Sequence, residues 1–144
     1  MANVQSINSA GLSIVKTFEG LSLTPYLCPA GWWTIGFGHL VKEDTPKVVT
    51  QEEAESYLER DIHGAELAVL RLVRPLSENQ FSALVSFTFN LGSGALQRST
   101  LRAMVNREEY DDAAEQFGLW VYGGGRKLPG LIRRRAAEEL LFRS

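Results

Sequence analysis

The sequence predicts an α+β fold, with a small antiparallel hairpin lobe and a larger helical lobe joined by a long helix. Two strand-like stretches, Leu21–Tyr26 and Trp32–Gly38, follow an apolar-periodic segment near the N-terminus. The later segments are typical of helices, and two of them open on capping boxes. We expect all 144 residues to form one domain, with the hairpin lobe at about residues 21–50.

The first helix is predicted to end at Glu19. Apolar residues with helical spacing precede it: Leu12, Ile14, Val15 and Phe18. Gly20 is in place to cap the helix, and the turn Cys28-Pro29-Ala30-Gly31 then joins the two strands. Glu19 should therefore face the hairpin, where the helix dipole and partial burial disfavour a charged carboxylate. Such a position suits a general acid.

An acid, a thiol and a hydroxyl lie close together in this segment. They are Glu19, Cys28 and Thr34, in the pattern Glu-x8-Cys-x5-Thr. Each residue alone is ordinary at a helix end, in a turn or in a strand, so their spacing alone does not establish catalysis.

The pattern resembles the active-site segment of the lysozyme-type phage endolysins of glycoside hydrolase family 24, where the second position is Asp or Cys. The segment Thr34-Ile35-Gly36-Phe37-Gly38-His39-Leu40 is similar to that family's Thr-x-Gly-x-Gly-His signature. This resemblance implies a lysozyme-like fold. It also implies a cleft between the lobes that is lined by Glu19, Cys28 and Thr34 as catalytic residues.

Later segments extend the resemblance. Phe89-Asn90-x-Gly92 resembles a family segment that lines the sugar cleft, and Trp120, a Gly-rich loop and an Arg-Arg pair resemble the family's C-terminal part. The implied substrate-binding residues are Phe37, Leu40, Phe89, Asn90 and Arg134, the last matching the arginine that pairs with the catalytic glutamate. The alternative is core packing for Phe89 and Trp120, and a solvated helix face for Arg133–Arg135.

The long helix is predicted from Gln51 to about Val73, opened by the capping box of Thr50 and Glu53. Its predicted inward face comprises Ala54, Tyr57, Leu58, Asp61, Ile62, Ala65, Val69 and Leu72. A carboxylate on a core face needs a partner, and His39 is the candidate for Asp61. The resemblance implies the same pair, for which we expect a structural role.

Further helices are predicted after the long one, and the N-terminal helix should pack with them on the helical lobe. Their expected bounds are Ser77 to Gly92, Ser99–Val105, Glu108–Phe117 and Ile132–Phe142.

Composition restricts the possible partners. The chain has a net charge of −2 and its basic C-terminal block is short, so we expect no nucleic-acid binding. It has no run of 18 apolar residues and begins without a secretory-signal pattern, so we expect no stable membrane insertion. A single cysteine allows no internal disulfide. His39 and His63 lack ligand spacing with other donors, so no metal or cofactor is expected.

The resemblance implies hydrolysis of the β-1,4 bond between N-acetylmuramic acid and N-acetylglucosamine in peptidoglycan. Glu19 would protonate the leaving oxygen. Cys28 would act either as a thiolate base of lowered pKa or as a polar positioner, with Thr34 holding the water, because a thiol with a pKa of about 8.5 is mostly neutral at pH 7. The alternatives are a lytic transglycosylase and a non-catalytic peptidoglycan-binding module.

We expect a monomer that stays in the host cytoplasm until a holin opens the inner membrane. It would then act on the cell wall from the periplasm.

Overall fold

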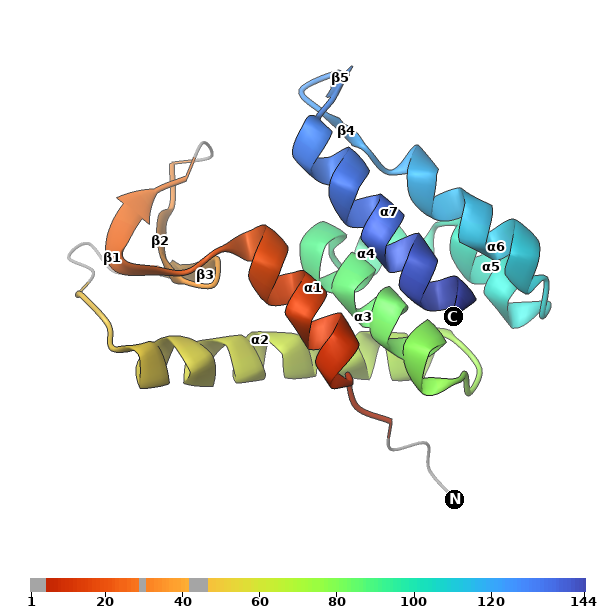
Figure 1. Ribbon diagram of the computed structural model, residues 1–144, viewed down its shortest axis with the longest axis horizontal. Helices are drawn as coiled ribbons and strands as arrows, with labels where there is room; N and C mark the ends of the chain where they lie inside the picture. Colours follow the sequence, from red (N-terminus) through yellow and green to blue (C-terminus); the bar gives the residue numbers. More distant parts are fainter. Residues whose placement is uncertain (1–4, 29–30, 42–46) are drawn as a thin grey trace.

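The chain folds into a β lobe and a helical lobe that are joined by one long helix (Figure 1). The computed structural model describes residues 5–28, 31–41 and 47–144. The elements are, in order, α1 Ser9–Glu19, β1 Ser22–Leu27, β2 Trp33–Gly36, β3 His39–Val41, α2 Gln51–Leu72, α3 Glu78–Leu91, α4 Ser93–Gln97, α5 Thr100–Asn106, α6 Tyr110–Gln116, the 3-10 helix η1 Phe117–Leu119, β4 Tyr122–Gly123, β5 Arg126–Lys127 and α7 Pro129–Arg143.

The β lobe is a three-stranded antiparallel sheet in the order β1-β2-β3, and not the two-stranded hairpin that was predicted. The predicted second strand is divided because the chain turns between Gly36 and Gly38, whose φ angles are +62° and +76°. Thr34 lies in the central strand, where it pairs with Tyr26 of β1 and Leu40 of β3. Pro29 and Ala30 of the predicted turn lie outside the described residues.

Helix α2 runs along the bottom of Figure 1 and passes beneath both lobes. Its N-terminus has the predicted capping box: the Thr50 N–H donates to Glu53 Oε1 at 3.0 Å, and the Glu53 N–H donates to Thr50 Oγ1 at 3.1 Å. Its buried face consists of Ala54, Leu58, Ile62, Ala65, Ala68, Val69 and Leu72. Tyr57 and Asp61, predicted on this face, are only partly buried.

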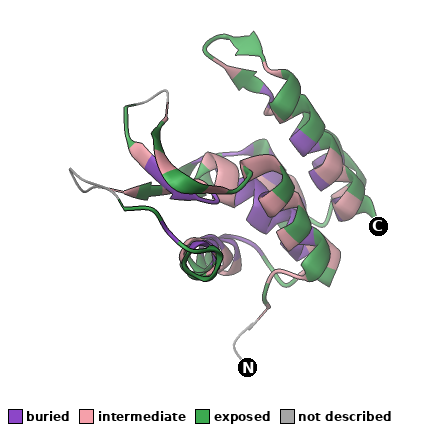
Figure 2. Ribbon diagram, turned by 60° about the vertical axis from the view of Figure 1, so that its left-hand side comes forward, coloured by how far each residue is buried: buried purple, intermediate pink, exposed green. Residues whose placement is uncertain are grey.

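Helix α3 is the centre of the helical lobe, and every residue from Phe81 to Thr88 is buried. A capping box of Ser77 and Gln80 opens it and Gly92 ends it, as the sequence predicts. Helices α1, α2 and α7 pack around it, so the N-terminal helix belongs to the helical lobe as expected. Figure 2 shows buried residues gathered on this central layer, whereas much of the β lobe is exposed.

Some short elements have no counterpart in the sequence prediction. They are α4, η1 and the small β4–β5 hairpin beside α7. Helix α7 also begins at Pro129, earlier than the predicted Ile132, because proline is favoured in the first turn of a helix.

Candidate active site

Glu19 is the last residue of α1, and its carboxylate is held from two sides. Arg134 of α7 donates from Nη1 to Glu19 Oε2 at 2.5 Å. On the other side a Cβ placed on Gly38 would lie 2.6 Å from Glu19 Oε1, so only a glycine fits there without displacing the carboxylate. The Gly-x-Gly-His segment therefore lets the β lobe approach the acid closely.

Two cavities meet at Glu19. The first, of about 550 Å³, lies between the β lobe, α2 and α3, and is called the main cavity below. It is lined by Glu19, Gly38, His39, Leu40, Asp61, Gly64, Ala65, Ala68, Thr88, Phe89, Asn90 and Ser93. The second, of about 610 Å³, lies between α1 and the start of α7 and is also lined by Asn90, Arg133 and Arg134. A polymer could therefore pass Glu19 on both sides.

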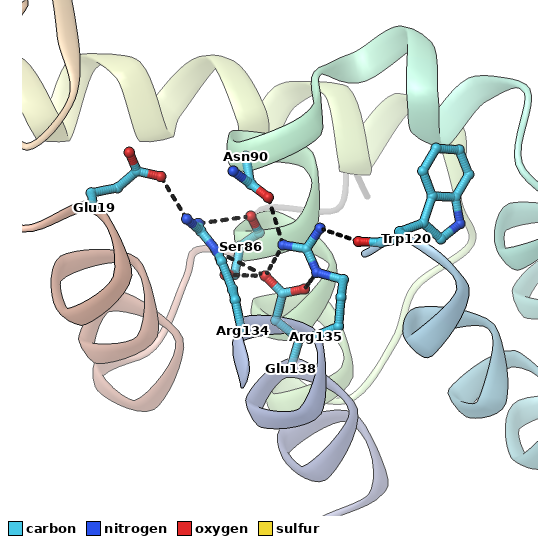
Figure 3. Close-up of polar contacts among 7 residues, drawn as sticks. All are labelled: Glu19, Ser86, Asn90, Trp120, Arg134, Arg135 and Glu138. Carbon is cyan, nitrogen blue, oxygen red and sulfur yellow. Dashed lines mark hydrogen bonds and ion pairs between the residues drawn. The ribbon is translucent and has the colours of Figure 1, made fainter. Parts of the chain in front are cut away.

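A buried ionic network lies behind Glu19 (Figure 3). Arg134 also donates from Nε to Glu138 Oε2 at 3.2 Å and from Nη2 to the Ser86 carbonyl at 3.2 Å. Ser86 Oγ donates to Glu138 Oε2 at 2.6 Å. Arg135 Nε lies 2.7 Å from Glu138 Oε1, close enough for an ion pair although the N–H is not aligned for a hydrogen bond. The acid is thus linked through Arg134 to a buried part of the helical lobe.

Burial changes the ionisation of this network. It raises the pKa of Glu138 from its ordinary value, while the neighbouring guanidinium groups oppose this change. It also lowers the pKa of Arg135, against the attraction of Glu138. The solvated-face alternative for Arg133–Arg135 is wrong for Arg134 and Arg135, which are buried. Glu138 lies four residues after Arg134 and three after Arg135, and this helical spacing was the signal in the sequence that could have predicted their pairing.

The same network orients Asn90. Arg135 donates from Nη2 to Asn90 Oδ1 at 2.8 Å. Because a guanidinium can only donate, the amide oxygen must face it, and the amide nitrogen is left on the side toward Glu19 (Figure 3). Asn90 therefore presents a hydrogen-bond donor in the cavity wall.

His39 and Asp61 form the predicted pair, with Asp61 Oδ2 2.8 Å from His39 Nδ1. The His39 ring stacks on Tyr57, with centroids 4.3 Å apart. The predicted core position of Asp61 is wrong, because the two side chains are 26% and 34% exposed and both line the main cavity. The cavity between α2 and the β lobe keeps this part of the α2 face open.

Three of the five predicted substrate-binding residues, Leu40, Phe89 and Asn90, line the main cavity. Phe37 does not: it is buried in the hydrophobic core, because the turn between Gly36 and Gly38 directs it inward. The Arg134 side chain is also buried and contacts Glu19, so it is placed to support the acid.

Cys28 and Thr34 are held by contacts within the β lobe and do not line the main cavity. The backbone N–H of Cys28 donates to the Trp32 carbonyl at 2.9 Å. The Thr34 hydroxyl is buried and donates to the same carbonyl at 3.4 Å. The structure thus gives Glu19 a place on the cavity wall, whereas Thr34 lies in the adjoining sheet and Cys28 directly follows its first strand.

Two further searches cover only the described residues. No three His, Cys, Asp or Glu side chains among them are grouped in a way that could hold a metal ion. No helix in the described ranges has the length and apolar character needed to cross a membrane.

Two lobes joined by a long helix, with a glutamate at a helix end on the wall of the cavity between them, define a lysozyme-type glycosidase. The chain belongs to the phage lysozyme family, whose model matches residues 16–138. It is 41% identical over 143 residues to an endolysin of Acyrthosiphon pisum secondary endosymbiont phage 1, covering 96% of this chain and 98% of the relative.

Solved structures agree with this assignment. The muramidase domain of SpmX from Asticaccaulis excentricus is similar with a TM-score of 0.90 and 38% identity, over 98% of this chain and 99% of that domain. A mutant of phage P22 lysozyme is similar with a TM-score of 0.85 and 36% identity, over 98% of this chain and 100% of the other.

Proposed function

We propose that this protein is a muramidase that hydrolyses the β-1,4 bond between N-acetylmuramic acid and N-acetylglucosamine in bacterial peptidoglycan. The observation that carries the proposal is the Glu19 carboxyl group, which lies where two cavities meet and is ion-paired with Arg134. Membership of the phage lysozyme family supports it.

Glu19 would act as the general acid that protonates the glycosidic oxygen as the bond breaks. Proton donation leaves a carboxylate, and the Arg134 guanidinium beside Oε2 is placed to stabilise that charge. The leaving sugar would lie in one of the two cavities and the sugar that forms the oxocarbenium-like centre in the other.

On the water side, Cys28 would act either as a thiolate base or as a positioner of water together with Thr34. This assignment is supported by the Glu-x8-Cys-x5-Thr spacing, which the family resemblance connects with catalysis. Both residues belong to the β lobe, Thr34 in strand β2 and Cys28 directly after β1, and the Gly38 turn of the same lobe contacts Glu19.

The decisive experiment is to incubate the purified protein with bacterial sacculi and to measure the masses of the released muropeptides. Hydrolysis should give fragments with ordinary reducing ends. A lytic transglycosylase would give anhydro ends that lack one water, and a non-catalytic binding module would bind sacculi without releasing fragments. The Glu19→Gln variant is the control, because it should bind but release nothing.

For the route to the wall, we propose action from within the host, as the name endolysin states for the relative. The monomeric protein would remain in the host cytoplasm until a holin lets it reach the periplasmic face of the wall. Expression alone should leave cells intact and co-expression of a holin should lyse them. Prompt lysis without a holin would overturn this route, and light scattering of the purified protein tests the monomer.

A further inference from the structure

Glu138 of α7 is fully buried, and the proposed mechanism gives it no role. It is nevertheless linked to the acid through a single side chain. Arg134 donates from Nη1 to Glu19 Oε2, and Nε of the same guanidinium donates to Glu138 Oε2 at 3.2 Å. One cation therefore serves two carboxylates, of which Glu19 lines both cavities and Glu138 lines neither.

The guanidinium of Arg134 is held on the side away from the acid. Glu138 holds Nε, and the Ser86 carbonyl holds Nη2 at 3.2 Å, which leaves Nη1 directed at Glu19. Ser86 Oγ in turn donates to Glu138 Oε2 at 2.6 Å. The side chain of Arg134 is 3% exposed and that of Glu138 is 0% exposed, against 20% for Glu19. Of the two carboxylates, only Glu19 can thus exchange its proton readily with a ligand.

Two opposing effects act on the charge of Glu138. Burial raises its pKa, and the guanidinium groups of Arg135 and Arg134 oppose this rise. Arg135 Nη2 donates to Glu138 Oε2 at 3.1 Å, and Arg135 Nε lies 2.7 Å from Glu138 Oε1. Two guanidinium groups thus share one buried carboxylate, and Glu19 is the second carboxylate that balances their charge.

We propose that Glu138 is a positioning residue for the general acid, because it holds Arg134 in place and balances its charge while Glu19 is protonated. The inference rests on the proposed function, which makes Glu19 the proton donor. A protonated Glu19 no longer offers Arg134 a negative charge, and an uncompensated buried cation is strongly destabilising. With Glu138 beside it, Arg134 keeps an anionic partner. Without Glu138, Arg134 would favour the ionised form of Glu19, which cannot donate a proton.

Other charged or titratable side chains also face Glu19, and a test must leave them in place. They are Lys16, which lies one turn earlier on α1 and is paired with Glu55, His39 and Asp61 in the main cavity, and Arg133 in the second cavity. The side-chain partners of Glu138 among the described residues are instead Ser86, Arg134 and Arg135. A substitution of Glu138 therefore changes the buried side of the network and leaves the charges in the cavities unaltered.

The test is Glu138→Gln, which is nearly isosteric and removes the charge. A general acid loses activity as the pH rises, so the alkaline limb of the activity profile reports its protonated form. In Glu138→Gln this limb should move to lower pH by about 1 unit, the scale on which one nearby charge acts. The kcat should fall along this limb and the KM for sacculi should not change, because Glu138 is buried and lines neither cavity at Glu19.

The matched control is Glu139→Gln, the same change at the next residue of α7. Glu139 is partly exposed and pairs with Arg143, with Arg143 Nε 3.0 Å from Glu139 Oε2. This variant should keep the alkaline limb of the wild type. An NMR titration of the Glu19 carboxyl carbon adds a readout that needs no substrate, and its midpoint should be lower in Glu138→Gln and unchanged in Glu139→Gln.

A second pair of variants addresses stability, since Glu138→Gln leaves two guanidinium groups without their shared carboxylate. The comparison is repeated between Arg135→Met and the double variant Arg135→Met/Glu138→Gln, in which one of these cations is absent. The alkaline limb should lie at lower pH in the double variant than in Arg135→Met alone. Melting temperatures measured for all variants confirm that each is folded during the assay.

A folded Glu138→Gln with the alkaline limb and the Glu19 midpoint of the wild type would overturn the inference, and so would an equal shift in Glu139→Gln. A lower melting temperature with an unmoved limb would reduce Glu138 to a structural residue. These results leave the proposed function standing if the wild type still releases fragments. A wild type that releases none fails the proposed function itself, whereas the titration of Glu19 still tests the effect of Glu138.

Discussion

Glu19 and Cys28 are close in the sequence, but different parts of the molecule hold them. The partners of Glu19 come from far away in the chain, with Arg134 separated from it by 115 positions. The backbone N–H of Cys28 and the hydroxyl of Thr34 both donate to the carbonyl of Trp32, which lies in the same lobe. The helical lobe therefore holds the acid in place, whereas the β lobe holds the thiol. Substitutions in α7 should disturb the first and spare the second.

The largest effect is expected for Glu19→Gln, which is nearly isosteric but cannot donate a proton as an acid. The rate of fragment release should fall by about 10²- to 10⁴-fold. The fold should persist, because the amide still fills the space beside Gly38. Release of muropeptides by mass spectrometry and thermal melting give the two readouts. Activity within tenfold of wild type would remove Glu19 from the acid role.

The second test removes a member of the core network, Arg135→Met. It leaves Glu138 Oε1 without its close cation and Asn90 without its donor. The free energy of unfolding should fall by about 3–5 kcal/mol at pH 7. Arg133→Met changes an exposed neighbour on the same helix and should cost less than about 0.5 kcal/mol. Equal losses for both variants, measured by chemical denaturation, would show that the network does not hold the lobe together.

This network also predicts a pH dependence. Because burial raises the pKa of Glu138, the folded chain holds that proton more tightly than the unfolded chain does. The resulting stabilisation is fully present below the ordinary value of 4.5 and is lost as the pH rises through the folded-state pKa. Arg135→Met removes a positive charge that opposes this rise, so the pKa of Glu138 should rise further in the variant. The stabilisation from the bound proton should then persist to higher pH in the variant than in the wild type. The stability gap between variant and wild type should therefore narrow toward acid; a constant gap would contradict the assignment.

A third test concerns the β lobe, where Cys28→Ala should lower activity by about 10²-fold, with Cys28→Ser between it and the wild type. Cys28→Asp should preserve or raise activity, because a carboxylate can serve as the base. A space-filling role predicts the opposite order, with Ala and Ser tolerated and Asp destabilising. Activities and melting temperatures measured together separate the two roles, and an active, stable Cys28→Ala would exclude the thiol from the mechanism.

The smallest effect is expected for Asp61→Asn. In a buried ion pair this substitution would lower the free energy of unfolding by about 3–5 kcal/mol. The side chains of His39 and Asp61, however, are a quarter to a third exposed. An ion pair at such exposure contributes at most about 1 kcal/mol. The melting temperature should change little, and a large loss would show that the pair is a part of the core.

Local signals in the sequence were sufficient for much of this fold. The capping boxes at Thr50 and Ser77 and the glycine caps at Gly20 and Gly92 predicted where helices begin and end, because capping depends on neighbouring residues. The β4–β5 hairpin was missed because two-residue strands have no measurable period.

The site was predicted less completely. The family resemblance indicated Glu19, Asn90 and Arg134 as site residues, and the structure brings the three together. The i,i+3 spacing of Arg135 and Glu138 was a local sign of this pairing, but the basic run resembles a solvated face, and Asn90, the other partner of Arg135, reaches it only in the folded state. Phe37 was misplaced for a related reason: its motif position does not tell which way the turn directs its ring.

Glu19 also lies at the joint between the lobes, since Gly20 ends α1 and β1 begins at Ser22. When two bodies rotate about a joint, atoms near the axis move least and atoms far from it move most. Gly20, with a φ of 71°, is the kind of element-terminal residue that absorbs such a rotation. Opening of the sheet away from α3 would carry Cys28 and Thr34 through a wide arc, while the acid would stay beside Arg134. The distance between acid and thiol would then measure how far the two lobes have closed on a glycan strand.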